Sequence, residues 1–232
     1  MSNELLEQKI DEIKQRLETE ATRIGAWDHN QIYHTACSKL ETIPGLWLEF
    51  GVYRGRSLST FADNTTNLVY GFDSFEGIPE HWNDENPKSV YTLNGQVPEG
   101  AIIGEEWHGM LDGSPTKSTR PWPTNVRLVK GWFSSTLPEF LKHHSEPVSF
   151  LHIDSDVYSS CKTVLTELKD RIINGTVILF DEILDYPEYR QHEIKAFAEF
   201  LLEKSDYTYE PIYHQKLGQY TQGCFRIHKI RK

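Results

Sequence analysis

The sequence predicts an α/β fold, in which a doubly wound and mostly parallel sheet is followed by an antiparallel pair of strands. Short apolar runs alternate with segments of helical periodicity five times along the 232 residues. Such alternation is typical of a parallel sheet with helices on both faces. Near the C-terminus, residues 207–213 and 223–230 are expected to form the closing pair, because Phe225 and Ile227 alternate with polar neighbours.

Two helices are expected ahead of the first strand. Over residues 4–20, apolar side chains recur at helical spacing among charged neighbours, as on one face of an amphipathic helix. This apolar face consists of Leu6, Ile10, Ile13 and Leu17. A second helix is expected over about residues 28–40, before the turn-forming sequence I-P-G. We treat residues 1–45 as N-terminal helices that pack on the domain, cover it as a lid, or join the subunits of a homo-oligomer.

Residues 46–232 are expected to form the main domain, with an insertion at about residues 81–122. The insertion shows little periodicity, and a run of this length is typical of a functional lid or a disordered segment. Its aromatic residues favour a packed lid; they include Trp82, Tyr91, Trp107 and Trp122. The expected strands are residues 46–50, 67–73, 126–129, 148–154 and 176–180, and the last helix is expected to open at Pro187.

Charge and cysteine usage exclude several classes of protein. The formal net charge is −10 and there is no long run of lysine or arginine, which argues against nucleic acid and anionic membranes as partners. The three cysteines are far apart and form no C-x-x-C pair, so a reducing compartment is expected. The N-terminus has no apolar signal core, and no apolar stretch approaches 18 residues. We therefore expect a cytoplasmic protein.

The segment L-W-L-E-F-G-V-Y-R-G at residues 46–55 is the centre of the prediction. It combines an apolar strand, a glycine turn and the start of a helix near Ser57, which is how doubly wound folds bind nucleotide-like cofactors. Gly51 and Gly55 bracket the turn and allow the backbone to approach a ligand closely. The spacing departs from G-x-G-x-x-G, so an NAD-dependent oxidoreductase is disfavoured. An ordinary turn between strand and helix remains the alternative.

Acidic residues follow the expected strands. Glu49, Asp73, Asp154 and the pair Asp181-Glu182 each fall at the carboxyl end of a strand, and ligands bind along that edge of open parallel sheets. Asp73 is suited to accept hydrogen bonds from a ribose diol. Ser74 and Phe75 follow it, and the Phe75 ring is expected either along an adenine face or in the core.

Three of these acids suggest a cation site. Asp154, Asp181 and Glu182 bring carboxylates together at neighbouring strand ends, and such oxygen ligands suit Mg²⁺ or Mn²⁺. The alternative is a helix N-cap at Asp154, Ser155 or Asp156 and a separate ion-paired acid. His152 lies within a strand and is interpreted as a core or supporting histidine, because its side chain alternates away from the expected site.

Five segments, taken in order, resemble one known family. They read L-E-F-G-V-Y-R-G-R-S, V-Y-G-F-D-S-F-E-G-I-P, K-G-W-F-S-S-T-L-P, F-L-H-I-D-S-D-V-Y and I-N-G-T-V-I-L-F-D-E. Over roughly residues 47–182, the chain resembles the macrocin O-methyltransferase family, a group of class I methyltransferases that use S-adenosylmethionine. The order and the spacing of the five segments carry the resemblance, with G-F-D-S-F-E-G-I-P as the most specific of them.

The resemblance implies a Rossmann-like domain and a Mg²⁺-assisted methyl transfer to a hydroxyl of a small acceptor, such as the sugar of a natural product. It implies that Glu49 and Gly51 lie at the methionine end of the cofactor and that Asp73 takes the ribose hydroxyls. Asp154, Asp181 and Glu182 match the metal positions, and Asp154 is the candidate for accepting the proton. Further cofactor contacts are assigned to Tyr53, Gly55, Ser57, Ser74, Phe75, Gly131 and Asp154.

Two alternatives stay open beside this interpretation. In the first, the enzyme is a metal-independent methyltransferase whose acids only cap helices. In the second, the same fold serves as a non-catalytic module that binds S-adenosylmethionine, because a fold does not determine a function. The acceptor itself cannot be inferred, since the segment at residues 81–122 matches the family only weakly.

Overall fold

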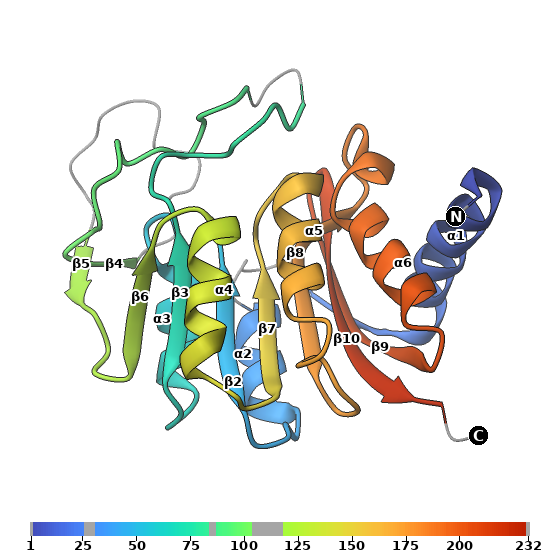
Figure 1. Ribbon diagram of the computed structural model, residues 1–232, viewed down its shortest axis with the longest axis horizontal. Helices are drawn as coiled ribbons and strands as arrows, with labels where there is room; N and C mark the ends of the chain where they lie inside the picture. Colours follow the sequence, from blue (N-terminus) through green and yellow to red (C-terminus); the bar gives the residue numbers. More distant parts are fainter. Residues whose placement is uncertain (1, 26–30, 84–86, 104–117, 231–232) are drawn as a thin grey trace.

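The computed structural model describes residues 2–25, 31–83, 87–103 and 118–230. Within these residues, one eight-stranded sheet forms the centre of the protein (Figure 1). From one edge to the other, its strands are β1 (Thr22–Ile24), β9 (Tyr207–Leu217), β10 (Tyr220–Lys229), β8 (Val177–Leu184), β7 (Val148–Ile153), β2 (Leu46–Phe50), β3 (Val69–Asp73) and β6 (Val126–Lys130).

Most neighbouring strands of this sheet are parallel. The strands β8, β7, β2, β3 and β6 run in one direction, and only β10 is antiparallel to both of its neighbours. The short strand β1, which was not predicted, pairs in parallel with β9. The predicted doubly wound sheet with a closing antiparallel pair is therefore confirmed.

Helices cover both faces of the sheet and divide the core into two large clusters. One cluster receives side chains from α1 (Asn3–Glu20), α4 (Phe133–His143), α5 (Tyr158–Glu167) and α6 (Glu193–Glu203), and the other from α2 (Gln31–Lys39) and α3 (Arg56–Asp63). In β2, Leu48 and Phe50 enter the first cluster while Trp47 enters the second. This alternation explains why the parallel strands are apolar on both sides.

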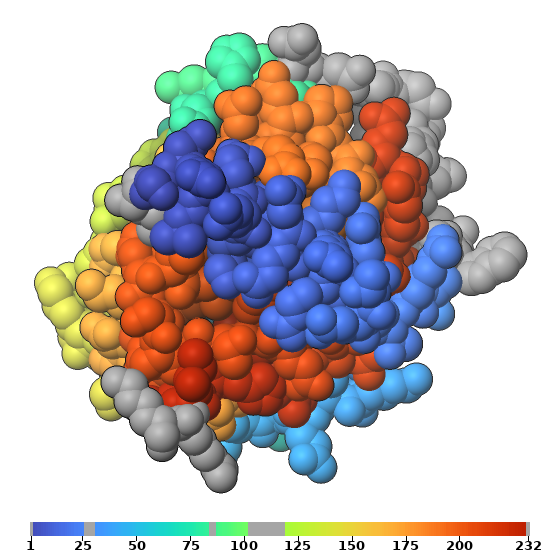
Figure 2. Space-filling model, turned by 90° about the vertical axis from the view of Figure 1, so that its right-hand side faces the viewer, coloured from blue at the N-terminus to red at the C-terminus, as the bar shows by residue number. Residues whose placement is uncertain are grey.

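The helix α1 packs on its own chain. Its predicted apolar face is buried against α6 and β9, and Figure 2 shows this blue helix lying across the orange and red C-terminal elements. Arg190 adds ion pairs to Glu7 and Asp11 of the helix. The amphipathic helix is confirmed, and the expected homo-oligomer stays a prediction.

The strand β8 is longer than predicted, which changes the position of two acids. It continues to Leu184 because β10 pairs with it as far as Thr221 opposite Leu184. Asp181 and Glu182 therefore lie within the strand and not after it. The prediction that the last helix opens at Pro187 is wrong as well. Glu188 has a left-handed φ of 65°, a short 3₁₀ turn η1 (Tyr189–Gln191) follows, and α6 begins only at Glu193.

The insertion has more secondary structure than expected. Its described part contains a two-stranded antiparallel sheet of β4 (Gly100–Ile103) and β5 (Ser118–Pro121). In Figure 1, the green trace of this segment runs beyond the upper ends of the parallel strands. Trp82 is buried and Trp122 is half-buried, whereas Trp107 lies outside the described residues. The role of the insertion as a lid stays a prediction.

Across the described ranges, no helix combines the length and the apolar character that a membrane span requires. The cytoplasmic location stays a prediction. Cys37, Cys161 and Cys224 are all free thiols.

Candidate cofactor and metal site

The loop after β2 is held in close backbone contact with the loop after β7. The Gly51 amide donates to the carbonyl oxygen of Phe72 at 3.0 Å, and the Asp154 amide donates to the carbonyl oxygen of Phe50 at 2.9 Å. Gly51 has φ +95°, and a Cβ built there would lie 1.6 Å from the carbonyl oxygen of Asp154. Only glycine fits this position, so the predicted cofactor turn and the predicted catalytic acid are direct neighbours.

Asp73 organises the same turn from the end of β3. Its Oδ2 accepts from the amides of Val52 at 2.9 Å and Tyr53 at 2.7 Å, and its Oδ1 accepts from the Phe75 amide at 2.7 Å. Tyr53 and Phe75 have left-handed φ values of 46° and 59°. Non-glycine residues adopt this conformation at a cost and often do so at functional sites. A carboxylate offers about four acceptor positions, so Asp73 keeps capacity for a ligand.

The turn after β2 leads directly into α3. Gly55 caps the helix with φ +77°, and a Cβ at this residue would lie 2.0 Å from the Trp122 ring of the insertion. Trp122 is fixed in turn, because its indole N–H donates to the carbonyl oxygen of Pro98 at 3.0 Å. The insertion therefore contacts the predicted cofactor turn through an aromatic ring.

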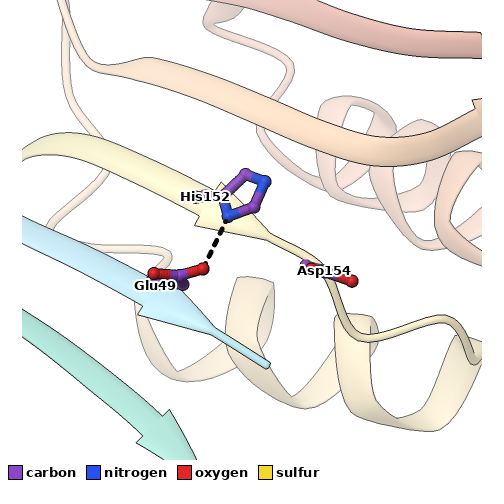
Figure 3. Close-up of side chains that lie close together, drawn as sticks. All are labelled: Glu49, His152 and Asp154. Carbon is purple, nitrogen blue, oxygen red and sulfur yellow. Dashed lines mark hydrogen bonds and ion pairs between the residues drawn. The ribbon is translucent and has the colours of Figure 1, made fainter. Parts of the chain in front are cut away.

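Glu49 is fully buried near the end of β2, and Figure 3 shows its carboxylate facing the ring of His152. Its Oε1 accepts from the Ser57 hydroxyl and lies 3.2 Å from Nδ1 of His152. Burial raises the pKa of Glu49, and the contact with His152 partly opposes this shift. Its Oε2 is buried and has no hydrogen-bond partner within the described structure. A cationic donor, such as the amino group of S-adenosylmethionine, fits this unpaired oxygen.

The remaining predicted cofactor residues lie around Asp73. Gly131 follows β6 with φ +138° and donates its amide to the carbonyl oxygen of Asp73 at 2.9 Å. The Ser74 hydroxyl accepts from the Glu76 amide at 3.0 Å. Phe75 is only 1% exposed and belongs to the core cluster on the α2 and α3 side, as the packing alternative expected.

Three carboxylates converge just after β7 and beside the last residues of β8. Asp154, Asp156 and Glu182 each place one oxygen within 4.8 Å of the other two. Burial and the charges of neighbouring acids raise the pKa of Asp154 and Glu182 well above the usual range and that of Asp156 to about 7. Oε2 of Glu182 is buried without a hydrogen-bond partner among the described residues.

A divalent cation fits this group. All its donors are carboxylate oxygens, which hard cations such as Mg²⁺ and Mn²⁺ prefer. Asp156 and Glu182 are buried and Asp154 is half-buried, so like charges on the three destabilise one another, and a bound cation would offset that repulsion. Asp154 also lies near Glu49 and His152, and these three residues form a second group with mixed nitrogen and oxygen donors (Figure 3).

Asp181 points to the other face of the sheet. Alternation along β8 turns Glu182 toward Asp156 and Asp181 toward α2. There Tyr33 of α2 and Gln222 of β10 both donate to Oδ1 of Asp181. Asp156 provides the third carboxylate instead. Asp156 was not among the predicted metal ligands, although the segment D-S-D contains it. Its left-handed φ of 61° brings it round beside Asp154. Asp181 as a metal ligand stays a prediction.

Comparison with known proteins identifies the family. Residues 19–201 match the family described as macrocin O-methyltransferase, TylF. This chain belongs to the macrocin O-methyltransferase family. The resemblance expected from the five sequence segments is thereby confirmed.

Curated relatives of this family member are longer proteins. This chain is 28% identical over 177 residues to the mycinamicin III 3″-O-methyltransferase of Micromonospora griseorubida, and the match covers 69% of this chain and 64% of the relative. It is 29% identical over 153 residues to the 8-demethyl-8-(2,3-dimethoxy-α-L-rhamnosyl)-tetracenomycin-C 4′-O-methyltransferase of Streptomyces olivaceus, covering 60% and 53%. The matched parts thus span between about half and two thirds of these relatives.

Solved structures share the fold of this macrocin O-methyltransferase family member. A calicheamicin methyltransferase superposes with a TM-score of 0.54 at 23% identity, covering 85% of this chain and 76% of the other. The O-methyltransferase TomG of Streptomyces achromogenes, solved with S-adenosylmethionine, gives a TM-score of 0.53 at 14% identity, covering 100% and 92%. Both likenesses show the Rossmann-like methyltransferase fold.

In this member of the macrocin O-methyltransferase family, tyrosines from three segments pack in one cluster near the acids. Tyr91 comes from the insertion, Tyr186 from the segment after β8, and Tyr220 from β10. Burial raises the pKa of each phenol, and the charge of Glu182 adds to the shift in all three. These rings form an aromatic border beside a polar centre, which is a common composition for a small-molecule site. The sequence offered no spacing that would group them.

Proposed function

We propose that the chain is an S-adenosylmethionine-dependent O-methyltransferase, assisted by Mg²⁺ or Mn²⁺, that acts on a hydroxyl of a sugar or other small natural-product acceptor. One observation carries the proposal. The glycine turn after β2 and the acid cluster after β7 meet through the contact between Gly51 and the Asp154 carbonyl oxygen. A methyl donor on the turn and a hydroxyl at the acids would therefore be neighbours, as a displacement reaction requires.

The cofactor would lie against the turn of residues 51–55. Glu49 would receive its amino group, since Oε2 of Glu49 has no partner among the described residues. Asp73 would bind its ribose hydroxyls, since a carboxylate that accepts three hydrogen bonds keeps a further acceptor position. Bound there, the cofactor supplies an electrophilic methyl group on a sulfonium. The chain itself holds the turn rigid through the hydrogen bonds that Asp73 accepts from three backbone amides.

The cation would be held by Asp154, Asp156 and Glu182, with Asp181 as the additional predicted ligand. When bound, such a cation lowers the pKa of a hydroxyl and fixes its orientation. Asp154 is the candidate to accept the proton that leaves the acceptor hydroxyl, because its backbone adjoins the glycine turn while its carboxylate belongs to the converging acids. The name of the Streptomyces olivaceus relative specifies O-methylation of a compound with a rhamnosyl group, which supports a sugar hydroxyl as the acceptor.

Asp73→Ala is expected to weaken S-adenosylmethionine binding by roughly tenfold or more, which is the scale of losing hydrogen bonds to a charged group. The change removes the ribose acceptor and releases the amides of Val52 and Tyr53. Isothermal titration calorimetry measures the affinity, with Asp11→Ala as a control, because Asp11 pairs with Arg190 on the surface. An unchanged affinity for the cofactor would contradict the assignment of Asp73.

Removal of divalent cations is expected to stop turnover without removing the cofactor. Activity should be lost in EDTA and return with Mg²⁺. The affinity for S-adenosylhomocysteine should change little, because a cation on Asp154, Asp156 and Glu182 would bind the acceptor and not the cofactor. Activity that persists in EDTA would favour the metal-independent methyltransferase. Cofactor binding without turnover on a panel of sugar-bearing and catechol-like acceptors would favour the non-catalytic module.

A further inference from the structure

Glu193, the first residue of α6, is a buried carboxylate that the sequence did not single out. It is 0% exposed. Its Oε1 accepts two hydrogen bonds from Ser155, one from the amide at 3.1 Å and one from the hydroxyl at 3.1 Å. Ser155 lies between Asp154 and Asp156. Glu193 therefore holds the middle of the turn that carries two of the three converging carboxylates.

This turn needs support from outside, because its own conformation is unfavourable. Asp156 adopts a left-handed φ of 61°, and a non-glycine residue persists there only when surrounding contacts enforce it. The Asp154 amide is bound to the carbonyl oxygen of Phe50 at 2.9 Å. At the following residue, Ser155, the turn is held by the two hydrogen bonds to Glu193.

Glu193 differs in role from the converging acids. In the part of the chain that the structure describes, it does not belong to either group of candidate metal ligands. Its Oε1 is bonded to the amide and the hydroxyl of Ser155, while its Oε2 is buried without a hydrogen-bond partner among the described residues. Outer residues that orient metal ligands commonly set the affinity of the site, and their loss costs about 10- to 100-fold.

We propose that Glu193 is a positioning residue, which fixes the turn from Asp154 to Asp156 so that both carboxylates meet Glu182 and bind a divalent cation. The identity of the bound ion rests on the proposed function. The role of Glu193 depends on its ability to accept hydrogen bonds from Ser155, and a glutamine can accept the same two bonds through its amide oxygen.

Direct binding of Mn²⁺ to the full chain, followed by electron paramagnetic resonance, tests this role without acceptor or turnover. Glu193→Met keeps a similar volume but accepts no such bonds, so the Kd for Mn²⁺ should rise about tenfold or more. Glu193→Gln should stay within about threefold of the unchanged protein, because it restores the acceptor. Glu199→Met is the matched control on α6, since Glu199 bonds Tyr158 at 2.8 Å and Lys162 at 3.0 Å.

Hydrogen exchange over residues 150–158 measures separately how firmly the turn is held. Thermal melting verifies that each variant is folded. The Ser155 amide should exchange faster in Glu193→Met and not in Glu193→Gln or Glu199→Met. Unchanged Mn²⁺ affinity in Glu193→Met would overturn the proposal. An equal loss in Glu193→Gln would also overturn it, because charge and not hydrogen bonding would then be responsible.

The test separates this inference from the proposed function. If the unchanged protein binds no Mn²⁺, the cation part of the proposed function fails, and the role of Glu193 in setting cation affinity fails with it. Hydrogen exchange then decides the remaining part, that Glu193 holds the turn. Faster exchange at Ser155 in Glu193→Met supports that part, and equal exchange overturns it.

Discussion

Asp154→Asn is expected to lower turnover by roughly 10³-fold or more, which is within the range that a general base contributes. Asparagine cannot accept the proton from the acceptor hydroxyl, and it removes one of the three carboxylates that converge with Asp156 and Glu182. The affinity for S-adenosylmethionine should stay within several-fold, because the contact with the cofactor turn is made by the Asp154 backbone.

The fold of this variant should remain intact. Burial and the charges of neighbouring acids raise the pKa of Asp154, so an uncharged side chain of the same shape relieves repulsion in the absence of a cation. Steady-state kinetics and calorimetry measure the two effects, and thermal melting checks the fold. Asp170→Asn is the control, since Asp170 lies on the surface 3.4 Å from Lys204. Loss of cofactor binding in Asp154→Asn would instead assign Asp154 to the cofactor site.

Gly51→Ala should be the most damaging single methyl addition in the turn. The added Cβ would lie 1.6 Å from the carbonyl oxygen of Asp154, and the residue has φ +95°. The conformation alone costs about 1–3 kcal/mol for a non-glycine residue, and the backbones of two loops must also move apart. We expect the free energy of unfolding to fall by more than about 3 kcal/mol and cofactor binding to be lost.

Gly218→Ala separates the cost of the left-handed backbone conformation from the cost of the clash with Asp154. Gly218 has φ +58°, and a Cβ there meets no described atom within 4 Å. The free energy of unfolding should therefore fall only by the cost of the left-handed conformation, about 1–2 kcal/mol. Urea unfolding of both variants measures the difference. Equal destabilisation of the two variants would contradict the close approach of the turn to Asp154.

Local patterns in the sequence determined the elements and most of the acids. The spacing of Leu6, Ile10, Ile13 and Leu17 predicted α1 and its buried face, because helical periodicity is a property of neighbouring residues. Strand ends near Glu49, Asp73 and Asp154 were likewise predicted, since apolar runs mark buried parallel strands. These residues reached one edge of the sheet because parallel strands end together.

Only the tertiary structure decided which carboxylates face one another. The pairing of β10 with β8 extends the strand past Phe180, and alternation then turns Asp181 toward Tyr33 and Glu182 toward Asp156. Glu193 likewise meets Ser155 across 38 residues of chain. Contacts between distant segments depend on strand register and helix packing, which no local periodicity encodes. The sequence therefore determined that acids gather at this edge, and the packing of β10, α2 and α6 determined the role that each of them can take.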